Sequence, residues 1–347
     1  MINKHSWLLS DLDNVDQTGL TVFSTFACGG GSSMGYKRAG YTVVGANDID
    51  QQMRLFYEKN LHPPFFIEAP IKELTKMDLP DEMFNLDVLD GSPPCSTFSM
   101  SGNREKDWGR EKFFREGQAA QVLDDLFFDF LDVAERLQPR VIIAENVRGM
   151  MLGNAKGYLR LIQSKLTQIR YKHSLFLINS AFCGVPQRRE RIFICALRGD
   201  IEREQLKIIC PYKETISVSE AFSDLIIKEE DKCRLSPENE KLWILTKPGQ
   251  ALDKATLKIK GKPGNWNHKK LHSNQPSLTI TASGDYSHWN EPRTLTIEEL
   301  IRLGSFPDDY NFMGNNARLV KYLIGMSVPP KMTEVVAAAV RDQWLLK

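Results

Sequence analysis

Short runs of apolar residues alternate along the first half of the chain with segments whose apolar residues recur every three or four positions. The runs predict buried strands that end near Phe26, Asp48, Gly91 and Val147. The spaced segments predict helices over about 31–40, 51–60 and 117–138, and a further helix that closes near residue 170. Strands that alternate with helices predict an α/β fold built on a doubly wound, mostly parallel sheet.

This alternation fades from about residue 199 to residue 289, where short strands and polar runs replace it. No Asp or Glu occurs between Lys254 and Gly284, although lysines accumulate there beside Trp266. The stretch is either a solvated lysine-rich surface or a face that tracks phosphates. The segment 329–346 then predicts a final helix with proline in its first turn. A chain of 347 residues is long enough for two domains, or for one large domain with an insertion.

Composition excludes some classes of protein without selecting one. The net charge of +1 excludes a globally basic nucleic-acid binder but allows a local basic face. The six cysteines lack zinc-ligand or C-x-x-C spacing, so we expect reduced thiols and no metal. No apolar run approaches the ~18 residues of a membrane span and no secretory signal is visible, so we expect a cytoplasmic protein that does not enter a membrane.

Several polar residues follow the predicted strands, and the carboxyl ends of parallel strands are where such sheets bind ligands. The glycines of 29–31 lie between a strand and a helix, where backbone amides can approach a ligand closely. Asp48 ends the next strand, where an acid can bind ribose hydroxyls. Because Met34 occupies the third glycine position of G-x-G-x-x-G, the dinucleotide motif is incomplete. The pattern favours a nucleoside-containing cofactor, with a purely structural turn as the alternative.

Cys95 follows Pro93 and Pro94, so it sits on a stiff corner after a buried strand. Most cysteines in folded proteins are buried and unreactive, and Cys95 could be one of them. Its position on this corner instead suits a nucleophile. Glu145 and Asn146 end another strand of the same sheet. A glutamate in a buried strand must be hydrogen-bonded or protonated, and a protonated one can donate to a ring nitrogen.

Arg189 and Arg191 precede an apolar strand, and strand alternation sends them to the same side. They form either a surface salt-bridge patch with Glu190 or a clamp for a phosphate or a polarised carbonyl. A thiol, a carboxylic acid, an arginine pair and a nucleoside-cofactor loop together indicate addition to an electron-poor ring. The thiolate would add to one carbon, and the neighbouring carbon would then attack an electrophilic cofactor.

Seven blocks in this order resemble the DNA (cytosine-5) methyltransferase family of bacterial or phage type. They are "FACGGGSSMG", "NDID", "GSPPCSTFS", "AENVRG", "PQRRERIF", "RTLTIEELIRLGSFPDDY" and "YLIGMSVPP". The resemblance covers most of the chain except about 200–275. It implies a Rossmann-like S-adenosylmethionine-dependent methyltransferase fold with a second, smaller target-recognition domain.

The resemblance also implies a reaction and its residues. Cys95 would attack C6 of a cytosine flipped out of the duplex. Glu145 would hold N3 and the exocyclic amine, Arg191 would hold O2, and C5 would take the methyl group, while Arg189 would help order the site. Asn146 is a further implied catalytic residue. S-adenosyl-L-methionine would be the cofactor and S-adenosyl-L-homocysteine the product. The implied cofactor residues are Phe26, Cys28, Gly29, Gly30, Gly31, Asp48 (on the ribose), Ile49, Ile71, Pro93, Ser327 and Val328.

The partner implied by the resemblance is double-stranded DNA. The catalytic domain would comprise 1–198 and 309–347, and 199–308 would form the target-recognition domain. The implied DNA contacts are Ser96, Ser99 and Arg104 in the basic loop after Pro94, together with Lys258, Lys260, Lys262, Lys269 and Lys270. A monomer suffices for one active site per chain, in a prokaryotic cell or in the host of a phage that encodes it. A restriction endonuclease would be the genetic partner of a restriction-modification pair.

The chain departs from the family's usual pattern at Ser96, Met326, Cys28 and Ile49, and none of these changes removes a group that the mechanism needs. Three alternatives stay open on these residues. The first is an RNA cytosine-5 methyltransferase that acts on tRNA, and the second is a nicotinamide-dependent oxidoreductase. The third is a catalytically inactive DNA-binding regulator, against which the intact Cys95 argues.

Overall fold

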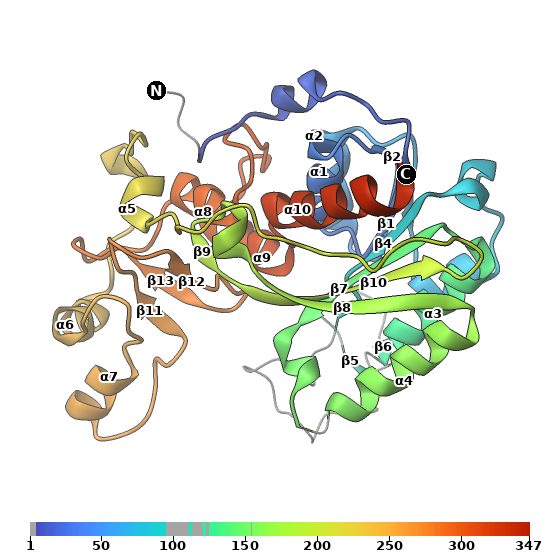
Figure 1. Cartoon of the computed structure of the whole chain (residues 1–347). Coiled ribbons are helices and arrows are strands. Elements are labelled where there is room, and N and C mark those ends of the chain that lie inside the picture. The colour runs from blue at the N-terminus through green and yellow to red at the C-terminus, as the bar shows by residue number, and fades with distance from the viewer. Residues whose placement is uncertain (1–4, 95–110, 113–120, 123–124, 154) are drawn as a thin grey trace. The chain divides into compact units, whose positions relative to one another are not determined.

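The computed structural model describes residues 5–94, 111–112, 121–122, 125–153 and 155–347 (Figure 1). The chain divides into two compact units. The larger, called here the sheet unit, comprises Asn14–Ile178, Glu190–Ile209 and Thr333–Lys347. The other, called the second unit, comprises Met1–Asp13, Asn179–Arg189 and Cys210–Met332. The functional division at residues 199 and 308 stays a prediction.

The sheet unit is built on a seven-stranded sheet of order β3-β2-β1-β4-β7-β10-β8. Neighbouring strands from β3 to β7 run parallel, whereas β10 runs antiparallel to β7. The doubly wound, mostly parallel sheet predicted from the alternation is therefore confirmed. Its strands are β1 (Thr21–Thr25), β2 (Thr42–Asp48), β3 (Phe66–Glu68), β4 (Val88–Gly91), β7 (Val141–Val147), β8 (Tyr171–Asn179) and β10 (Glu190–Arg198).

Helices cover both faces of this sheet, with α1, α2 and α10 on one side and α3 and α4 on the other (Figure 1). Their bounds are α1 Gly31–Arg38, α2 Gln51–Leu61, α3 Leu126–Leu137, α4 Ala155–Gln168 and α10 Pro330–Val340. Short 3-10 turns at Ile71–Thr75, Asp81–Asn85 and Arg148–Met151 join them, and a π-helical turn, Arg341–Leu345, follows α10. Tyr41 Oη donates to Ala337 O at 3.1 Å, which fixes α10 beside β2.

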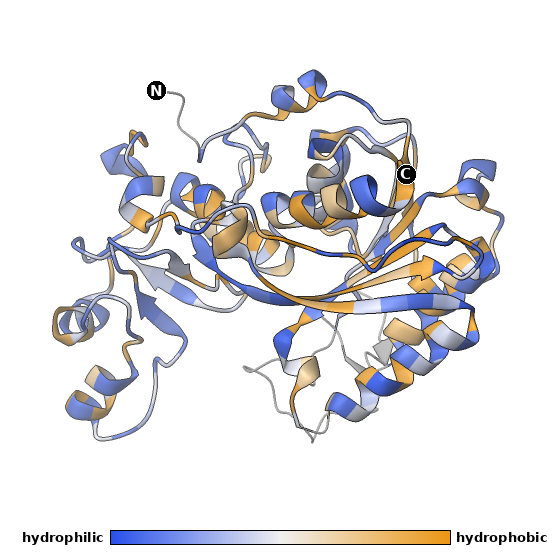
Figure 2. Ribbon diagram, in the orientation of Figure 1, coloured by the Kyte–Doolittle hydropathy of each residue, from blue (hydrophilic) through white to orange (hydrophobic). Residues whose placement is uncertain are grey.

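The predicted start of the third helix is wrong. The helix α3 begins at Leu126, and Gln121–Val122 forms β6, paired with β5, Glu111–Lys112. An apolar residue such as Val122 can match the helical period by chance outside the helix. The apolar face of α3 packs its phenylalanines and leucines against Phe23 and Leu89 of the sheet. Figure 2 shows apolar residues along the central strands and on the inner side of α3.

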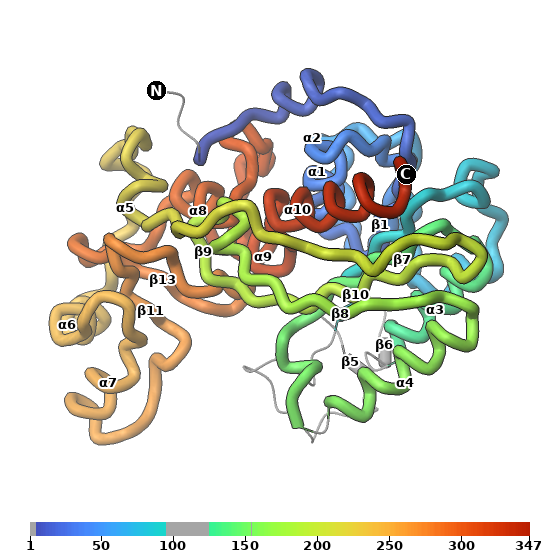
Figure 3. The backbone as a smooth tube through the Cα atoms, in the orientation of Figure 1, coloured from blue at the N-terminus to red at the C-terminus, as the bar shows by residue number. Residues whose placement is uncertain are grey.

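The second unit is made of short elements, as the loss of alternation after residue 199 predicts (Figure 3). Its strands pair as two-stranded sheets, β11 with β13 and β12 with β9. The bounds are β9 Gln187–Arg188, β11 His268–Lys270, β12 Ser277–Leu278, β13 Asp285–Ser287, α5 Val218–Ala221, α6 Pro237–Leu245, α7 Asp253–Lys260, α8 Ile297–Gly304 and α9 Ala317–Met326. The 3-10 turns are Leu9–Asn14, Ser180–Cys183 and Glu229–Asp231.

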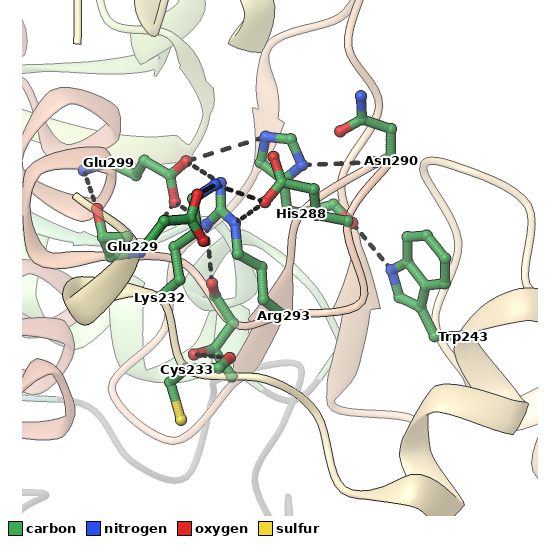
Figure 4. A network of polar contacts seen from close by, with 11 residues as sticks. Glu229, Lys232, Cys233, Trp243, His288, Asn290, Arg293 and Glu299 are labelled. Carbon is green, nitrogen blue, oxygen red and sulfur yellow. Dashed lines mark hydrogen bonds and ion pairs between the residues drawn. The ribbon is translucent and has the colours of Figure 1, made fainter. Parts of the chain in front are cut away.

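A buried ion pair fixes the start of α8 in the second unit (Figure 4). Arg293 donates from both terminal nitrogens to Glu299, at 2.9 and 2.8 Å, and both residues are almost fully buried. Glu299 also accepts from Thr296 N at 2.9 Å, which closes a capping box at the helix N-terminus. Burial and the nearby Arg293 charge lower the pKa of His288 to about 4, so this imidazole is neutral at pH 7. The block "RTLTIEEL" therefore has a structural role.

The stretch Ala317–Leu345 is long and apolar enough to cross a membrane, and no other helical stretch among the described residues passes that test. Of its most apolar window, 67% is buried inside the fold. Such burial is the pattern of a core helix rather than of a lipid-facing one.

Candidate active site

The carboxyl ends of four adjacent strands form one edge of the sheet unit. Because β2, β1, β4 and β7 are neighbours and parallel, the residues that follow them lie along the same edge. These are the glycine loop after β1, Asp48 at the end of β2, Pro93 after β4, and Glu145 with Asn146 near the end of β7. The antiparallel β10 brings Arg191 opposite Val147 at the same edge. The sheet thus brings the glycine loop, Asp48, Glu145, Asn146 and Arg191 to one edge.

The glycine loop uses left-handed backbone conformations. Phe26, Cys28 and Gly30 have φ of 52°, 49° and 81°. A Cβ on Gly30 would meet the side chains of Leu61 and Tyr57 on α2, so a larger residue there would displace them in addition to straining the backbone. Gly30 caps α1 without a side-chain hydrogen bond, which leaves amides of the first turn without a side-chain acceptor. The loop therefore serves the fold and still presents donors that an anionic group of a cofactor could use.

Asp48 supports the glycine loop from below. Its Oδ2 accepts from Cys28 N at 2.8 Å and its Oδ1 accepts from Asp50 N at 2.9 Å. Burial raises the pKa of Asp48 to about 6, and these amide hydrogen bonds oppose that shift. A carboxylate has about four acceptor positions, so two amides leave room for the hydroxyls of a ribose. The residues present thus fit a nucleoside cofactor.

Glu145 and Arg191 form a charged pair at the end of β7. Arg191 Nε lies 2.8 Å from Glu145 Oε1, and the side chains are 14% and 10% exposed. Burial lowers the pKa of Arg191, and the Glu145 carboxylate opposes that shift. The contact lies outside hydrogen-bond geometry, and Oε1 has no hydrogen-bond partner among the described residues. Because Glu190 pairs with Arg148 instead, at 2.6 Å, the surface-patch alternative does not hold for Arg191.

Asn146 holds the corner that leads toward Cys95. Its Nδ2 donates to Pro93 O at 2.9 Å, and its Oδ1 accepts from Val147 N at 2.8 Å. Asn146 is buried, so both contacts are shielded from water. Cys95, Ser96, Ser99 and Arg104 lie outside the described residues. The structure therefore describes the chain up to Pro94, the residue before Cys95.

Arg189 belongs to the second unit and is buried there. Its Nη1 donates to Ile280 O at 3.1 Å and to Gly325 O at 2.9 Å, so it braces the end of α9. Ser327 and Val328 follow in the same unit and are buried. Among the described residues, Ser327 Oγ has no hydrogen-bond partner, which is the state expected of a group that a ligand would complete.

The remaining cofactor candidates differ in exposure. Ile71 is buried in the apolar core, Ile49 is half-buried, and Cys28 Sγ lies 3.6 Å from Met53 Sδ. No group of three or more His, Cys, Asp or Glu side chains gathers as metal ligands in the part of the chain that the structure describes.

The predicted DNA-contact lysines separate into two groups. Lys258 and Lys262 are exposed, and Lys260, also exposed, pairs with Glu238 at 2.6 Å. Lys270 is buried, where its Nζ donates to Trp243 O at 3.2 Å and lies 3.5 Å from the indole centroid. Burial also lowers the pKa of Lys269. Lys270 thus has a partner inside its own unit, because a lysine stem can pack on an aromatic ring.

Sequence reasoning missed Asp90, a buried carboxylate in β4. The signal was present, because an acid in the apolar run "DVLDG" is as unusual as Glu145 in "VIIAEN".

The family model of the C-5 cytosine-specific DNA methylases matches residues 20–342. The Type II methyltransferase M.NgoFVII of Neisseria gonorrhoeae is 29% identical over 336 residues, which cover 89% of this chain and 83% of that protein. The Type II methyltransferase M.Eco47II of Escherichia coli is 27% identical over 97% of this chain and 82% of its own length. A crystal structure of a DNMT2 mutant from Spodoptera frugiperda shares the fold, with a TM-score of 0.64, 16% identity, and coverage of 93% of this chain and 99% of that one. The match over most of its length shows that this chain belongs to the C-5 cytosine-specific DNA methylases, so it is a DNA (cytosine-5-)-methyltransferase that uses S-adenosylmethionine.

Proposed function

We propose that this enzyme methylates C5 of a cytosine flipped out of a specific double-stranded DNA sequence, through a covalent bond between Cys95 and C6. The observation that carries the proposal is the Glu145–Arg191 pair beside the corner that Asn146 fixes. A carboxylate at the end of β7 and a guanidinium at the start of the neighbouring β10 offer hydrogen-bond partners for one edge of a cytosine ring. The nucleophile would follow that corner by two residues.

Each of the three proposed catalytic side chains has a separate role in the reaction. The Cys95 thiolate adds to C6, which makes C5 nucleophilic. Glu145 holds N3 and the exocyclic amine, so that negative charge developing on the ring is neutralised by a proton. Arg191 donates to O2, which withdraws electron density from the ring. S-adenosylmethionine supplies the electrophilic methyl group and S-adenosylhomocysteine is the product. A base then removes the C5 proton, the double bond re-forms, and Cys95 leaves as the thiolate.

The cofactor would lie over the glycine loop. Asp48 keeps acceptor positions for the ribose hydroxyls, and the loop of Gly29, Gly30 and Gly31 leads into α1, whose N-terminus has no side-chain cap. Phe26 packs against Phe130 with ring centroids 6.5 Å apart and would offer its free edge to the cofactor. The other residues proposed for this site are Cys28, Ile49, Ile71, Pro93, Ser327 and Val328.

The DNA contacts are proposed for two regions. Ser96, Ser99 and Arg104 would contact the duplex next to the flipped base. The exposed Lys258, Lys260 and Lys262 on and after α7 would contact phosphates of the recognised sequence, with Lys269 nearby. Lys270 would act indirectly, since Trp243 already binds its ammonium. Residues 199–308 would form the target-recognition domain, and 1–198 with 309–347 the catalytic domain.

The cellular setting is proposed from the relatives, which are named Type II methyltransferases. The enzyme would act as a monomer in a prokaryotic cytoplasm, or in the host of a phage that encodes it. A restriction endonuclease of the same specificity would be its genetic partner.

The test is transfer of a labelled methyl group from S-adenosylmethionine to duplex DNA, to tRNA, and to duplex DNA with the Cys95→Ser variant. Label in duplex DNA that disappears in the variant is the expected result. Label in tRNA alone would overturn the choice of substrate and favour the RNA enzyme. Cofactor binding without transfer to either nucleic acid would contradict the proposed catalysis and leave a DNA-binding regulator.

A further inference from the structure

Asp90 is a buried carboxylate in the centre of the sheet unit, and its hydrogen bonds join three elements. The residue is 3% exposed in β4, between β1 and β7. Its Oδ2 accepts from Ser24 Oγ of β1 at 2.7 Å, and its Oδ1 accepts from Tyr36 Oη of α1 at 3.1 Å. Both donors are fully buried. The carboxylate thus links the helix behind the glycine loop to β4 and β1.

The strand register puts Asp90 on the same side of the sheet as Glu145. Asp90 pairs with Ile143 of β7, and partners in register point to the same face. Glu145 lies two residues beyond Ile143, so its side chain points to that face as well. The charge of Glu145 accordingly acts on Asp90. Asp90 is therefore below the cytosine-binding pair rather than in a remote part of the core.

Apolar packing alone does not explain a carboxylate at this position. Burying a charge is unfavourable unless it is strongly paired, and a leucine of similar volume would satisfy the core. The groups that act on Asp90 are the hydroxyls of Ser24 and Tyr36 and the carboxylate of Glu145. These groups include no cation. Burial raises the pKa of Asp90 to about 7, the two hydroxyls oppose the shift, and Glu145 adds to it.

The strand that contains Asp90 leads directly to the nucleophile's corner. Thr25 Oγ1 donates to Asp90 O at 2.9 Å, which locks β4 to the end of β1. A Cβ on Gly91 would lie 2.5 Å from Phe130 and 2.7 Å from Thr25 Oγ1, so β4 cannot shift freely here. Two residues later, Pro93 is held by Asn146. Movement of β4 against α1 would therefore change the distance between the glycine loop and the corner before Cys95.

We propose that Asp90 is a positioning residue for methyl transfer, which fixes the glycine-loop helix α1 against the strand that leads to Cys95. The proposal rests on the proposed function, because it takes the loop as the cofactor site and Cys95 as the nucleophile. Asp90 does not touch either substrate. Its ionised form accepts both hydroxyl hydrogen bonds and is the form that positions α1.

The test compares Asp90→Asn, Asp90→Leu and Tyr36→Phe with a matched control, Asp87→Asn. Asp87 precedes β4, where it accepts from Arg140 Nη1 at 2.7 Å and from Thr21 N at 2.8 Å. We expect Asp90→Leu to lower kcat/KM about tenfold or more, because small displacements of reacting groups are costly in rate. It should also melt somewhat lower than the wild type, because the buried hydroxyls of Ser24 and Tyr36 lose their acceptor. Asp87→Asn should melt at a lower temperature and keep its kcat/KM.

Four readouts separate positioning from a purely structural role. Asp90→Asn keeps the shape and, like the protonated acid, one acceptor and one donor, so it should recover most of the activity that Asp90→Leu loses at pH 6. The ratio of wild-type to Asp90→Asn kcat/KM should rise severalfold, roughly as the ionised fraction does, between pH 6 and pH 8. Tyr36→Phe and Asp90→Leu should be non-additive, because each removes the same contact. Binding of S-adenosylmethionine, measured by calorimetry without DNA, should weaken in Asp90→Leu.

Full activity and an unchanged pH profile in Asp90→Leu would overturn the proposal. So would a loss of activity in Asp87→Asn as large as that in Asp90→Leu at the same loss of melting temperature. A wild type that binds S-adenosylmethionine but methylates no DNA would instead contradict the proposed function. In that case the calorimetric comparison of Asp90→Leu with the wild type still decides whether Asp90 positions the glycine loop.

Discussion

Glu145→Gln is the substitution that tests the proposed chemistry most directly. Glutamine keeps the shape of the side chain and one carbonyl acceptor opposite Arg191, but it removes the negative charge 2.8 Å from Nε. The side chains of Arg191 and Glu145 are only 14% and 10% exposed, so water weakly screens the attraction between them that the substitution removes. Breaking a buried pair costs about 3–5 kcal/mol, and the retained amide reduces this to about 2–3 kcal/mol.

The expected melting temperature follows from that free energy. For a unit of this size, each kcal/mol lowers Tm by about 2–4 °C, so Glu145→Gln should melt about 4–12 °C lower than the wild type. The rate should fall much further, by about 10²–10⁴-fold, because an amide cannot give a proton to N3. Single-turnover transfer of labelled methyl to duplex DNA, well below Tm, measures this rate.

The matched control is Glu190→Gln. Glu190 pairs with Arg148 at 2.6 Å, but the two side chains are 39% and 52% exposed, so their pair contributes about 0–1 kcal/mol. This variant should keep its rate. A Glu145→Gln enzyme with kcat/KM within about threefold of the wild type would refute the proton-donor role, whatever its melting temperature.

Four further predictions follow from the contacts described above. Asn146→Ala should lower kcat about 10–100-fold with unchanged cofactor affinity, because Pro93 O loses its donor and the corner before Cys95 loosens; steady-state kinetics and calorimetry check this. Arg189→Ala should lower the free energy of unfolding by about 2–4 kcal/mol in denaturant melts, since two buried carbonyls lose their donor. Replacing Lys258 and Lys262 together with alanine should weaken DNA binding and reduce its salt dependence by about two released counterions, measured in a salt titration. Burial raises the pKa of Asp90 from 3.8 to about 7, so the protonated form stabilises the fold fully below pH 4, and this contribution is lost as pH rises through 7. The free energy of unfolding of Asp90→Asn should therefore exceed that of the wild type by up to about 4 kcal/mol at pH 8 and should equal it at pH 4.

The centre of the sheet and the residues at its edge could be predicted from sequence because β2, β4 and β7 are mostly apolar and carry an acid at or near their carboxyl ends. Asp48 and Glu145 are visible in this way, and so was Asp90 in principle. The start of α3 was not predictable from periodicity, because Val122 fits the helical spacing and yet pairs in a short strand. The burial of Lys270 depends on Trp243, which is remote in sequence, and no local pattern reports such a contact.

The two-stranded sheets of the second unit were invisible for the same reason. Strands of two or three residues, such as β12 and β9, pair across long sequence separations and carry no period of their own. From sequence, Arg293 and Glu299 were only letters of a block that resembles a family. The structure shows that they pair with each other and that Glu299 closes the capping box of α8.

The path of the chain through its units has a consequence for synthesis on the ribosome. All strands of the seven-stranded sheet lie between residues 21 and 198, but the helix α10 that closes one face comes after the long excursion through Cys210–Met332. A nascent chain therefore completes its strands early and leaves the face beside Tyr41 without α10 until residues 330–340 emerge. During that interval the exposed face favours aggregation, which a chaperone that binds apolar surface would prevent. Translation that stalls between residues 210 and 332 would leave a chain that has all strands of the sheet but lacks the helix α10.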